Sequence, residues 1–120
     1  MILWQVYCVQ LITMMGFDVI FQDVDIIWFK HPFDYFLKKD SPVNSADIIF
    51  QDDGQRSIRY APYSANSGFY YVRNSHKTQH LFNQLLGSGN EILSTISHQQ
   101  TLTALLAEHA SLYGLQAKII

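Results

Sequence analysis

Two acids, Asp23 and Asp25, are separated by a single residue inside the otherwise largely apolar stretch 17–29. The apolar residues 19–21 before them predict a buried strand of a sheet that is covered on both faces. On an extended backbone, residues i and i+2 point to the same side, so the two carboxylates would meet at one point. At a separation of about 5 Å and an effective dielectric of about 20, their charges repel by about 3 kcal/mol. A divalent cation with oxygen ligands would offset this repulsion, so the pair predicts a metal site.

A turn or helix cap is the alternative role for either acid alone, because Asp favours turns and caps. A cap needs only one acid, whereas this stretch carries two. In an open α/β sheet, ligands bind beyond the carboxyl ends of the strands. The acid pair follows the predicted strand at that end, which favours the metal site.

The elements that must position these acids follow from hydrophobic periodicity and turn residues. A helix is predicted over 2–15, and a short helix or turn over 33–39. A helix capped by Asn74-Ser75 is predicted to stop at Gly87, and one more is predicted to start near Asn90 and to reach about 110. Strands are predicted at 19–21, 46–50, 69–73 and 115–120, with a long loop at 51–65 and a short segment at 26–29 that buries Trp28. This order predicts an α/β fold whose sheet is mixed, because no crossover helix lies between the second and third strands.

Composition limits the size of the protein and its partners. The 120 residues fit one domain, with a net charge of −2, 15% charged residues and no cluster of Lys and Arg, which argues against a nucleic-acid surface. The lone Cys8 lies in an apolar stretch and is predicted to be a core thiol. Residues 1–17 carry no charged side chain. Because Gln5, Gln10 and Thr13 interrupt the apolar run, it predicts a helix packed on both sides, with a membrane anchor or signal as the alternative.

Three stretches together resemble the nucleotide-diphospho-sugar transferase family, which includes plant and algal xylosyl- and arabinosyltransferases. The first is Val19 to Trp28 with its Asp-x-Asp, followed by His31-Pro32. The second is Ala46-Asp47-Ile48 with Asp52, and the third is Asn66-Ser67-Gly68-Phe69 through Arg73. The resemblance spans roughly residues 10 to 118. One departure is that the family usually carries Asp-Gln ahead of its late helix, where this chain has His98-Gln99.

The resemblance implies a GT-A type, Rossmann-like α/β fold. Such transferases begin with a nucleotide-binding strand and helix well upstream of their acid pair. Residues 1–120 are therefore expected to form a single partial domain that carries the Asp-x-Asp strand and the acceptor-side half. The resemblance also implies the Golgi lumen as the compartment, although the sequence itself shows no targeting segment or membrane anchor.

The same resemblance implies transfer of a sugar from a nucleoside-diphosphate donor to the hydroxyl of a glycan or glycoprotein acceptor. Asp25 is expected to bind a manganese or magnesium ion, and Asp23 to bind the ribose or reach the metal through water. The residues expected to bind the donor are Asp23, Asn66, Gly68 and Gln99, and those expected to be catalytic are Asp52, Asn66 and His98. The alternatives are an exposed loop acid for Asp52, a plain turn into a strand for Asn66 and a helix-start residue for His98. Arg56 and Arg59 could contact phosphate or simply be solvated.

Two other functions remain open at this stage. A phosphohydrolase with an aspartyl nucleophile also begins with a buried strand and Asp-x-Asp, but it would be expected to carry Thr or Val where this chain has Ile26. A truncated, inactive transferase-like chain could instead act as a binding module.

Overall fold

The computed structural model describes residues 2–41, 43–89 and 98–120, and the fold is α/β, as predicted. The predicted start of the late helix, near Asn90, lies outside the described residues, and the later part of that predicted helix is α5. In chain order the elements are α1 Ile2–Met14, β1 Val19–Gln22, α2 Phe33–Phe36, β2 Ile48–Asp52, the 3-10 turn η1 Ile58–Tyr60, β3 Ala65–Val72, α3 His76–Gly87, α5 His98–Tyr113 and β4 Ala117–Ile119.

The described strands form a four-stranded mixed sheet in the order β1-β3-β2-β4. β3 runs antiparallel to both β1 and β2, and β4 runs parallel to β2. Only a loop with one 3-10 turn joins β2 to β3, and a connection of that kind suits an antiparallel pair. α3 and α5 lie between β3 and β4 in the chain, so β4 can return parallel to β2. The predicted mixed sheet is confirmed, and it is compatible with part of a GT-A type fold.

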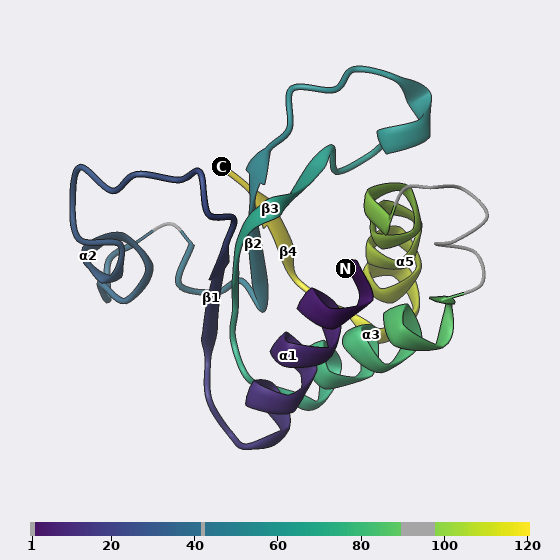
Figure 1. Cartoon of the computed structure of the whole chain (residues 1–120), viewed down its shortest axis with the longest axis horizontal. Helices are drawn as coiled ribbons and strands as arrows, with labels where there is room; N and C mark the ends of the chain where they lie inside the picture. Colours follow the sequence, from purple (N-terminus) through teal and green to yellow (C-terminus); the bar gives the residue numbers. More distant parts are fainter. Residues whose placement is uncertain (1, 42, 90–97) are drawn as a thin grey trace.

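Helices cover both faces of the sheet (Figure 1). One core cluster joins α1, α3 and α5 to the sheet, and it includes Ile48, Phe50 and Tyr70. The second cluster joins α2 and the segment after it to Ile49 and Tyr71. Neighbouring residues of β2 and β3 thus belong to opposite clusters, as the two-residue period of a strand requires. This division gives the sheet an α1/α3/α5 face and an α2 face.

The helix α1 is packed on one side only, so the prediction that it is packed on both sides is wrong. Val6 and Val9 are buried, whereas Trp4 is 69% exposed and Met14 63% exposed. Cys8 is also exposed, so the predicted core thiol is wrong as well. Apolar residues occur all round this helix in the sequence, and the sequence pattern therefore cannot tell which side meets the sheet. Within the described residues, no helix has the length and apolar character needed to cross a bilayer.

Local signals place the ends of two helices as predicted. Gly16 has a φ of +94°, and the N–H groups of Gly16 and Phe17 donate to the carbonyls of Thr13 and Ile12, which is the Schellman arrangement. Ser75 caps α3 in a capping box with Thr78, which satisfies two backbone donors of the first turn. These caps fix where the chain leaves α1 for β1 and where it enters α3 from β3.

His109 of α5 is a fully buried titratable side chain in the contact between α3 and α5. Its Nε2–H donates to Oε1 of Gln84, and its buried Nδ1 has no hydrogen-bond partner among the described residues. Burial lowers the pKa of His109 from its ordinary 6.5; His80 lowers it further, and Glu108 acts in the opposite direction. Protonation of Nδ1 would therefore bury a charged donor that has no acceptor.

Stability is accordingly expected to fall in acid. The unfolded chain takes up the His109 proton at a higher pH than the folded chain, so the free energy of unfolding decreases as the pH drops through 6.5. Urea denaturation at about pH 7.5 and about pH 5.5 should show this loss in the wild type and a smaller loss in His109→Gln. The exposed His76→Gln serves as the matched control and should behave as the wild type. An unchanged pH dependence in His109→Gln would contradict this assignment.

Candidate functional site

The polar side chains singled out in the sequence lie along one edge of the sheet. Because β1 and β2 both run antiparallel to β3, their carboxyl ends lie beside the amino end of β3. Asp23 follows β1, Asp52 ends β2, and Asn66 and Gly68 belong to the start of β3. β3 separates β1 from β2, which puts the two outer strands about 10 Å apart. The edge therefore has two parts, one around Asp23 and one around Asp52.

Asp23 lies directly against Gly68. The N–H of Asp23 donates to the carbonyl of Gly68 at 2.8 Å, which extends the β1–β3 pairing by one residue. A β-carbon added to Gly68 would lie 2.5 Å from Oδ2 of Asp23 and 3.1 Å from Oδ1 of Asn66. The same Oδ1 of Asn66 accepts a hydrogen bond from the N–H of Gly68 at 2.7 Å. A residue without a side chain at position 68 is thus what allows the carboxylate and the amide to share this place.

Asp23 and Asp25 do not lie together on an extended strand, so that part of the prediction is wrong. β1 ends at Gln22, and Val24 and Asp25 lie in a turn. The N–H of Ile26 donates to the carbonyl of Asp23 at 3.4 Å across this turn. Asp23 is half-buried and Asp25 is exposed. The two carboxylates therefore have different environments, and their joint action on one ion stays a prediction.

The chemistry of the two carboxylates suits a divalent cation. Among the described residues, no hydrogen bond to either carboxylate is observed, and neither forms an ion pair. The described residues contain no group of three or more His, Cys, Asp and Glu side chains that could hold a metal. Mg²⁺ commonly binds one or two carboxylates and takes its other ligands from water and substrate phosphates. Asp23 and Asp25 match that number and that type of ligand.

The negative charge of Asp23 also affects the pKa of a buried tyrosine, Tyr70. Burial raises the pKa of Tyr70 well above its ordinary value, and the negative charge of Asp23 raises it further. Tyr70 stacks on Phe21 with ring centroids 5.0 Å apart, and both rings belong to the α1/α3/α5 side of the sheet. Asp23 therefore stands over a packed aromatic layer on that face.

Gln99 reaches the same end of β3 from the first turn of α5. Its Oε1 accepts a hydrogen bond from Oγ of Ser67 at 3.2 Å, so its amide nitrogen stays available as a donor. Gln99 is thus next to the strand segment that holds Asn66 and Gly68. His98 is the first residue of α5, and its side chain lies outside what the structure describes.

Asp52 is held in an ion pair on the other side of β3. Its two carboxylate oxygens accept hydrogen bonds from Arg56 at 3.0 and 2.7 Å, and Oδ1 also accepts one from the N–H of Gly54. The hydrogen bond from Arg56, followed by that from Gly54, holds the pKa of Asp52 well below its ordinary value. A carboxylate with so low a pKa is a poor general base. The catalytic role predicted for Asp52 has no support in these contacts, and Arg56 is engaged by Asp52.

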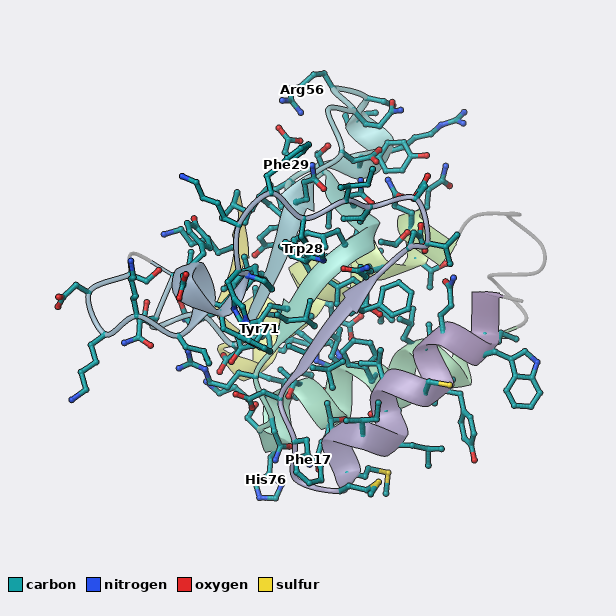
Figure 2. The ribbon with its side chains drawn as sticks, turned by 60° about the vertical axis from the view of Figure 1, so that its left-hand side comes forward. Phe17, Trp28, Phe29, Arg56, Tyr71 and His76 are labelled. Atoms are coloured by element: carbon teal, nitrogen blue, oxygen red, sulfur yellow. The ribbon has the colours of Figure 1, made fainter. Side chains whose placement is uncertain are left out.

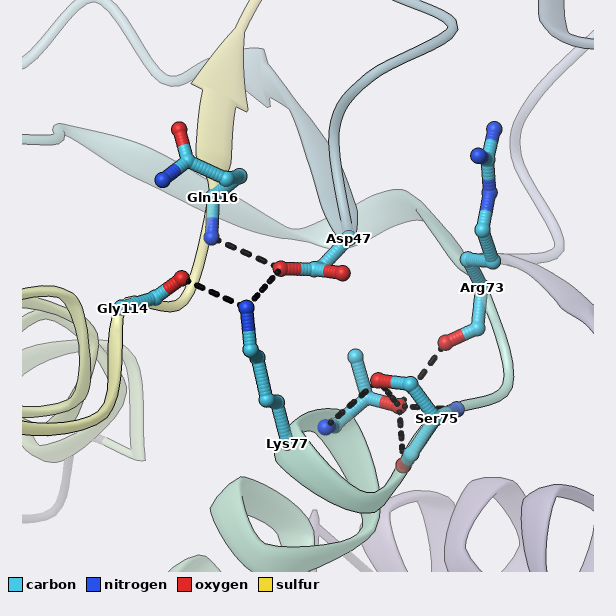
Figure 3. A network of polar contacts seen from close by, with 7 residues as sticks. Asp47, Arg73, Ser75, Lys77, Gly114 and Gln116 are labelled. Carbon is cyan, nitrogen blue, oxygen red and sulfur yellow. Dashed lines mark hydrogen bonds and ion pairs between the residues drawn. The ribbon is translucent and has the colours of Figure 1, made fainter.

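Asp47, which belongs to the second stretch of the resemblance, lies at the opposite end of β2 from the site. Its Oδ2 accepts a hydrogen bond from the N–H of Gln116 at 2.9 Å and lies 3.8 Å from Nζ of Lys77. Nζ of Lys77 also donates to the carbonyl of Gly114 at 2.9 Å. Figure 3 shows this network, which ties the start of β4 and the start of α3 to the start of β2. Asp47 therefore has a structural role.

Trp28, which lies near the candidate site, differs from the prediction in its burial. It was predicted to be buried, but it is 40% exposed. Its indole N–H donates to Oε1 of Gln22, and its ring packs edge-on against Phe69 with centroids 5.3 Å apart. Gln22 is exposed, so its residue type gives no sequence signal for this contact. The hydrogen bond between Ser67 and Gln99 was also missed, because the two residues lie far apart in the sequence.

Comparison with known proteins gave no match to a curated protein and none to a solved structure. One family model, described as nucleotide-diphospho-sugar transferase, matches residues 1–120. The match covers the acid pair after β1, the start of β3 and the first turn of α5. The chain therefore belongs to the nucleotide-diphospho-sugar transferase family.

Proposed function

We propose that this chain takes part in metal-dependent transfer of a sugar from a nucleoside-diphosphate sugar to a hydroxyl of a glycan or glycoprotein. Membership of the family supports the nucleotide-sugar donor. The observation that carries the proposal is the close approach of Asp23 and Asn66 over Gly68. A side chain at position 68 would displace these oxygens, so the site is shaped around the carboxylate.

In this proposal Asp23 and Asp25 have different roles in binding the donor. Asp25, which is exposed, binds the manganese or magnesium ion, and Asp23 binds the ribose or reaches the ion through water. When bound, such an ion neutralises the charge that grows on the departing diphosphate. Asn66 and Gln99 offer amide groups to the sugar, and His98 contacts the diphosphate or the ion.

The overall reaction is a substitution at the anomeric carbon of the donor sugar. The acceptor oxygen forms a bond to that carbon, and the bond from the carbon to the diphosphate oxygen breaks. The electron pair leaves with the diphosphate, and the hydroxyl proton is released. On the basis of the resemblance, we extend the proposal in two ways. The chain would transfer a pentosyl or hexosyl group, as an enzyme of the plant or algal xylosyl- and arabinosyltransferase type. Its compartment would be the Golgi lumen.

Calorimetry with manganese and uridine diphosphate tests the proposal. The wild type should bind the nucleotide in a manganese-dependent manner, and Asp25→Asn should weaken this binding at least about tenfold, since one charged ligand is lost. Asp34→Asn, which changes an exposed acid in α2, is the matched control and should bind as the wild type. Equal affinity in Asp25→Asn would discard the assignment.

A turnover assay then separates an enzyme from a binding module. A panel of nucleotide sugars with manganese should reveal release of nucleoside diphosphate by the wild type. Nucleotide binding without any release would support the binding module instead, and a phosphoaspartate trapped at Asp23 would support the phosphohydrolase.

A further inference from the structure

The segment after Asp25 places an aromatic ring in a fixed position at the surface. The indole N–H of Trp28 is used by Gln22, and the contact with Phe69 has an interplanar angle of 65°. An edge-type contact of this kind covers at most one face of the indole, and 40% of Trp28 stays exposed. Figure 2 shows Trp28 near the middle of the view, with Phe29 above it. Trp28 is therefore held in one orientation by two contacts while part of its ring faces solvent.

A hollow lies beside this ring on the edge of the sheet. Its volume is about 360 Å³, and it is lined by Ile26, Ile27, Trp28, Gln51, Phe69 and Ile120. This size falls within the range of small-molecule sites. None of these six described lining residues has an ionisable side chain, and Gln51 contributes an amide. The hollow thus combines apolar walls, one aromatic ring and one amide, which suits a neutral ligand with both apolar and polar surfaces.

A pyranose ring has such surfaces. One of its faces consists of C–H groups, which pack against an aromatic ring, and its rim carries hydroxyls, which bond to amide groups. A flat hydrophobic partner would leave the amide of Gln51 without a hydrogen-bond partner at a cost in free energy. The chemistry of the hollow therefore favours a glycan over a purely apolar surface.

We infer that Trp28 is the stacking platform for the acceptor glycan, with Gln51 bonding to its hydroxyls. This inference rests on the proposed function, because it assigns the acceptor side of that reaction. Phe69 belongs to the α2 side of the sheet, whereas Asp23 acts on Tyr70 of the opposite side. Asp25 lies in the turn between Asp23 and Trp28. The acceptor thus approaches this turn from the α2 side.

Tryptophan fluorescence tests the platform directly. The chain has two Trp residues, Trp4 and Trp28, so Trp4→Phe leaves Trp28 as the single reporter. In that background, cellotriose or xylotriose, with and without manganese and uridine diphosphate, should produce a saturable change in emission. Sorbitol, which has hydroxyls but no ring, should not. A change that does not saturate, or that sorbitol reproduces, would overturn the inference.

Calorimetry with the same trisaccharides compares the affinity of the wild type with that of matched variants. Trp28→Ala should weaken binding about tenfold, as expected for the loss of one aromatic contact, and Trp28→Phe should retain most of it. Gln51→Ala should also weaken binding, whereas Gln116→Ala, at the other end of the sheet, should not. Wild-type affinity in Trp28→Ala would overturn the platform. Because these titrations measure the glycan alone, glycan binding without manganese-dependent nucleotide binding would refute the proposed donor site and leave the platform standing.

Discussion

Replacing Gly68 with alanine is expected to lower turnover of the nucleotide-sugar donor about 100-fold, the size of effect that misplacing a reacting or binding group by about 1 Å can have. The new β-carbon would lie 2.5 Å from Oδ2 of Asp23 and 3.1 Å from Oδ1 of Asn66. Both oxygens belong to side chains that can rotate, so they move and the backbone stays. The variant therefore displaces the groups that the proposed function assigns to the donor.

The fold itself should tolerate Gly68→Ala. Gly68 is not among the described residues with positive φ, so alanine meets no backbone strain there. We expect the free energy of unfolding to change by no more than about 1 kcal/mol. Steady-state kinetics of donor turnover and urea denaturation measure the two effects separately.

Gly87→Ala is the matched control, because a β-carbon there meets none of the described residues within 4 Å. It should keep both turnover and manganese-dependent nucleotide binding. Full turnover and full nucleotide affinity in Gly68→Ala would show that the donor does not use Asp23 and Asn66.

Replacing Tyr70 with alanine is expected to lower the free energy of unfolding by about 3–5 kcal/mol, as for other large aromatic residues removed from a core. The Tyr70 ring packs against Phe21, Phe50 and Phe82, with centroids 5.0, 5.2 and 6.2 Å away. These rings come from β1, β2 and α3, so the cavity would open where three elements meet. A loss of this size is a large part of the stability of an ordinary domain.

Urea denaturation of three variants checks this expectation. Tyr70→Phe keeps the ring and should cost much less than Tyr70→Ala. Tyr7→Ala removes a 44% exposed ring from α1 and should change the free energy of unfolding by less than about 1 kcal/mol. Similar losses in Tyr70→Ala and Tyr7→Ala would mean that the aromatic layer beneath Asp23 does not hold the sheet together.

Features that depend on neighbouring residues in the chain were predictable. The cap at Ser75 and the left-handed Gly16 are local, because each satisfies backbone groups within a few residues. The mixed sheet also followed from the sequence, since the absence of a helix between β2 and β3 can be seen in the pattern of residues. The family resemblance rested on the same short stretches, and the family match confirms it.

Features that depend on which surfaces meet were not predictable. The sequence of α1 is apolar on every side, so only its packing on the sheet decided that Val6 is buried and Cys8 is exposed. In the same way, Trp28 reads as a core residue, and its contacts with Gln22 and Phe69 leave it partly exposed. The ion pair of Asp52 with Arg56 depends on how the loop after β2 folds back.

By itself, the sequence determined the α/β class, the ends of its best-capped helices and the family to which the chain belongs. These features depend on the types of residues that lie close together in the sequence. Only the tertiary structure decided that Asp23 and Asn66 come together over Gly68 and that Ser67 bonds to Gln99. Strand pairing and helix packing bring together residues that are tens of positions apart, and no local pattern records those distances.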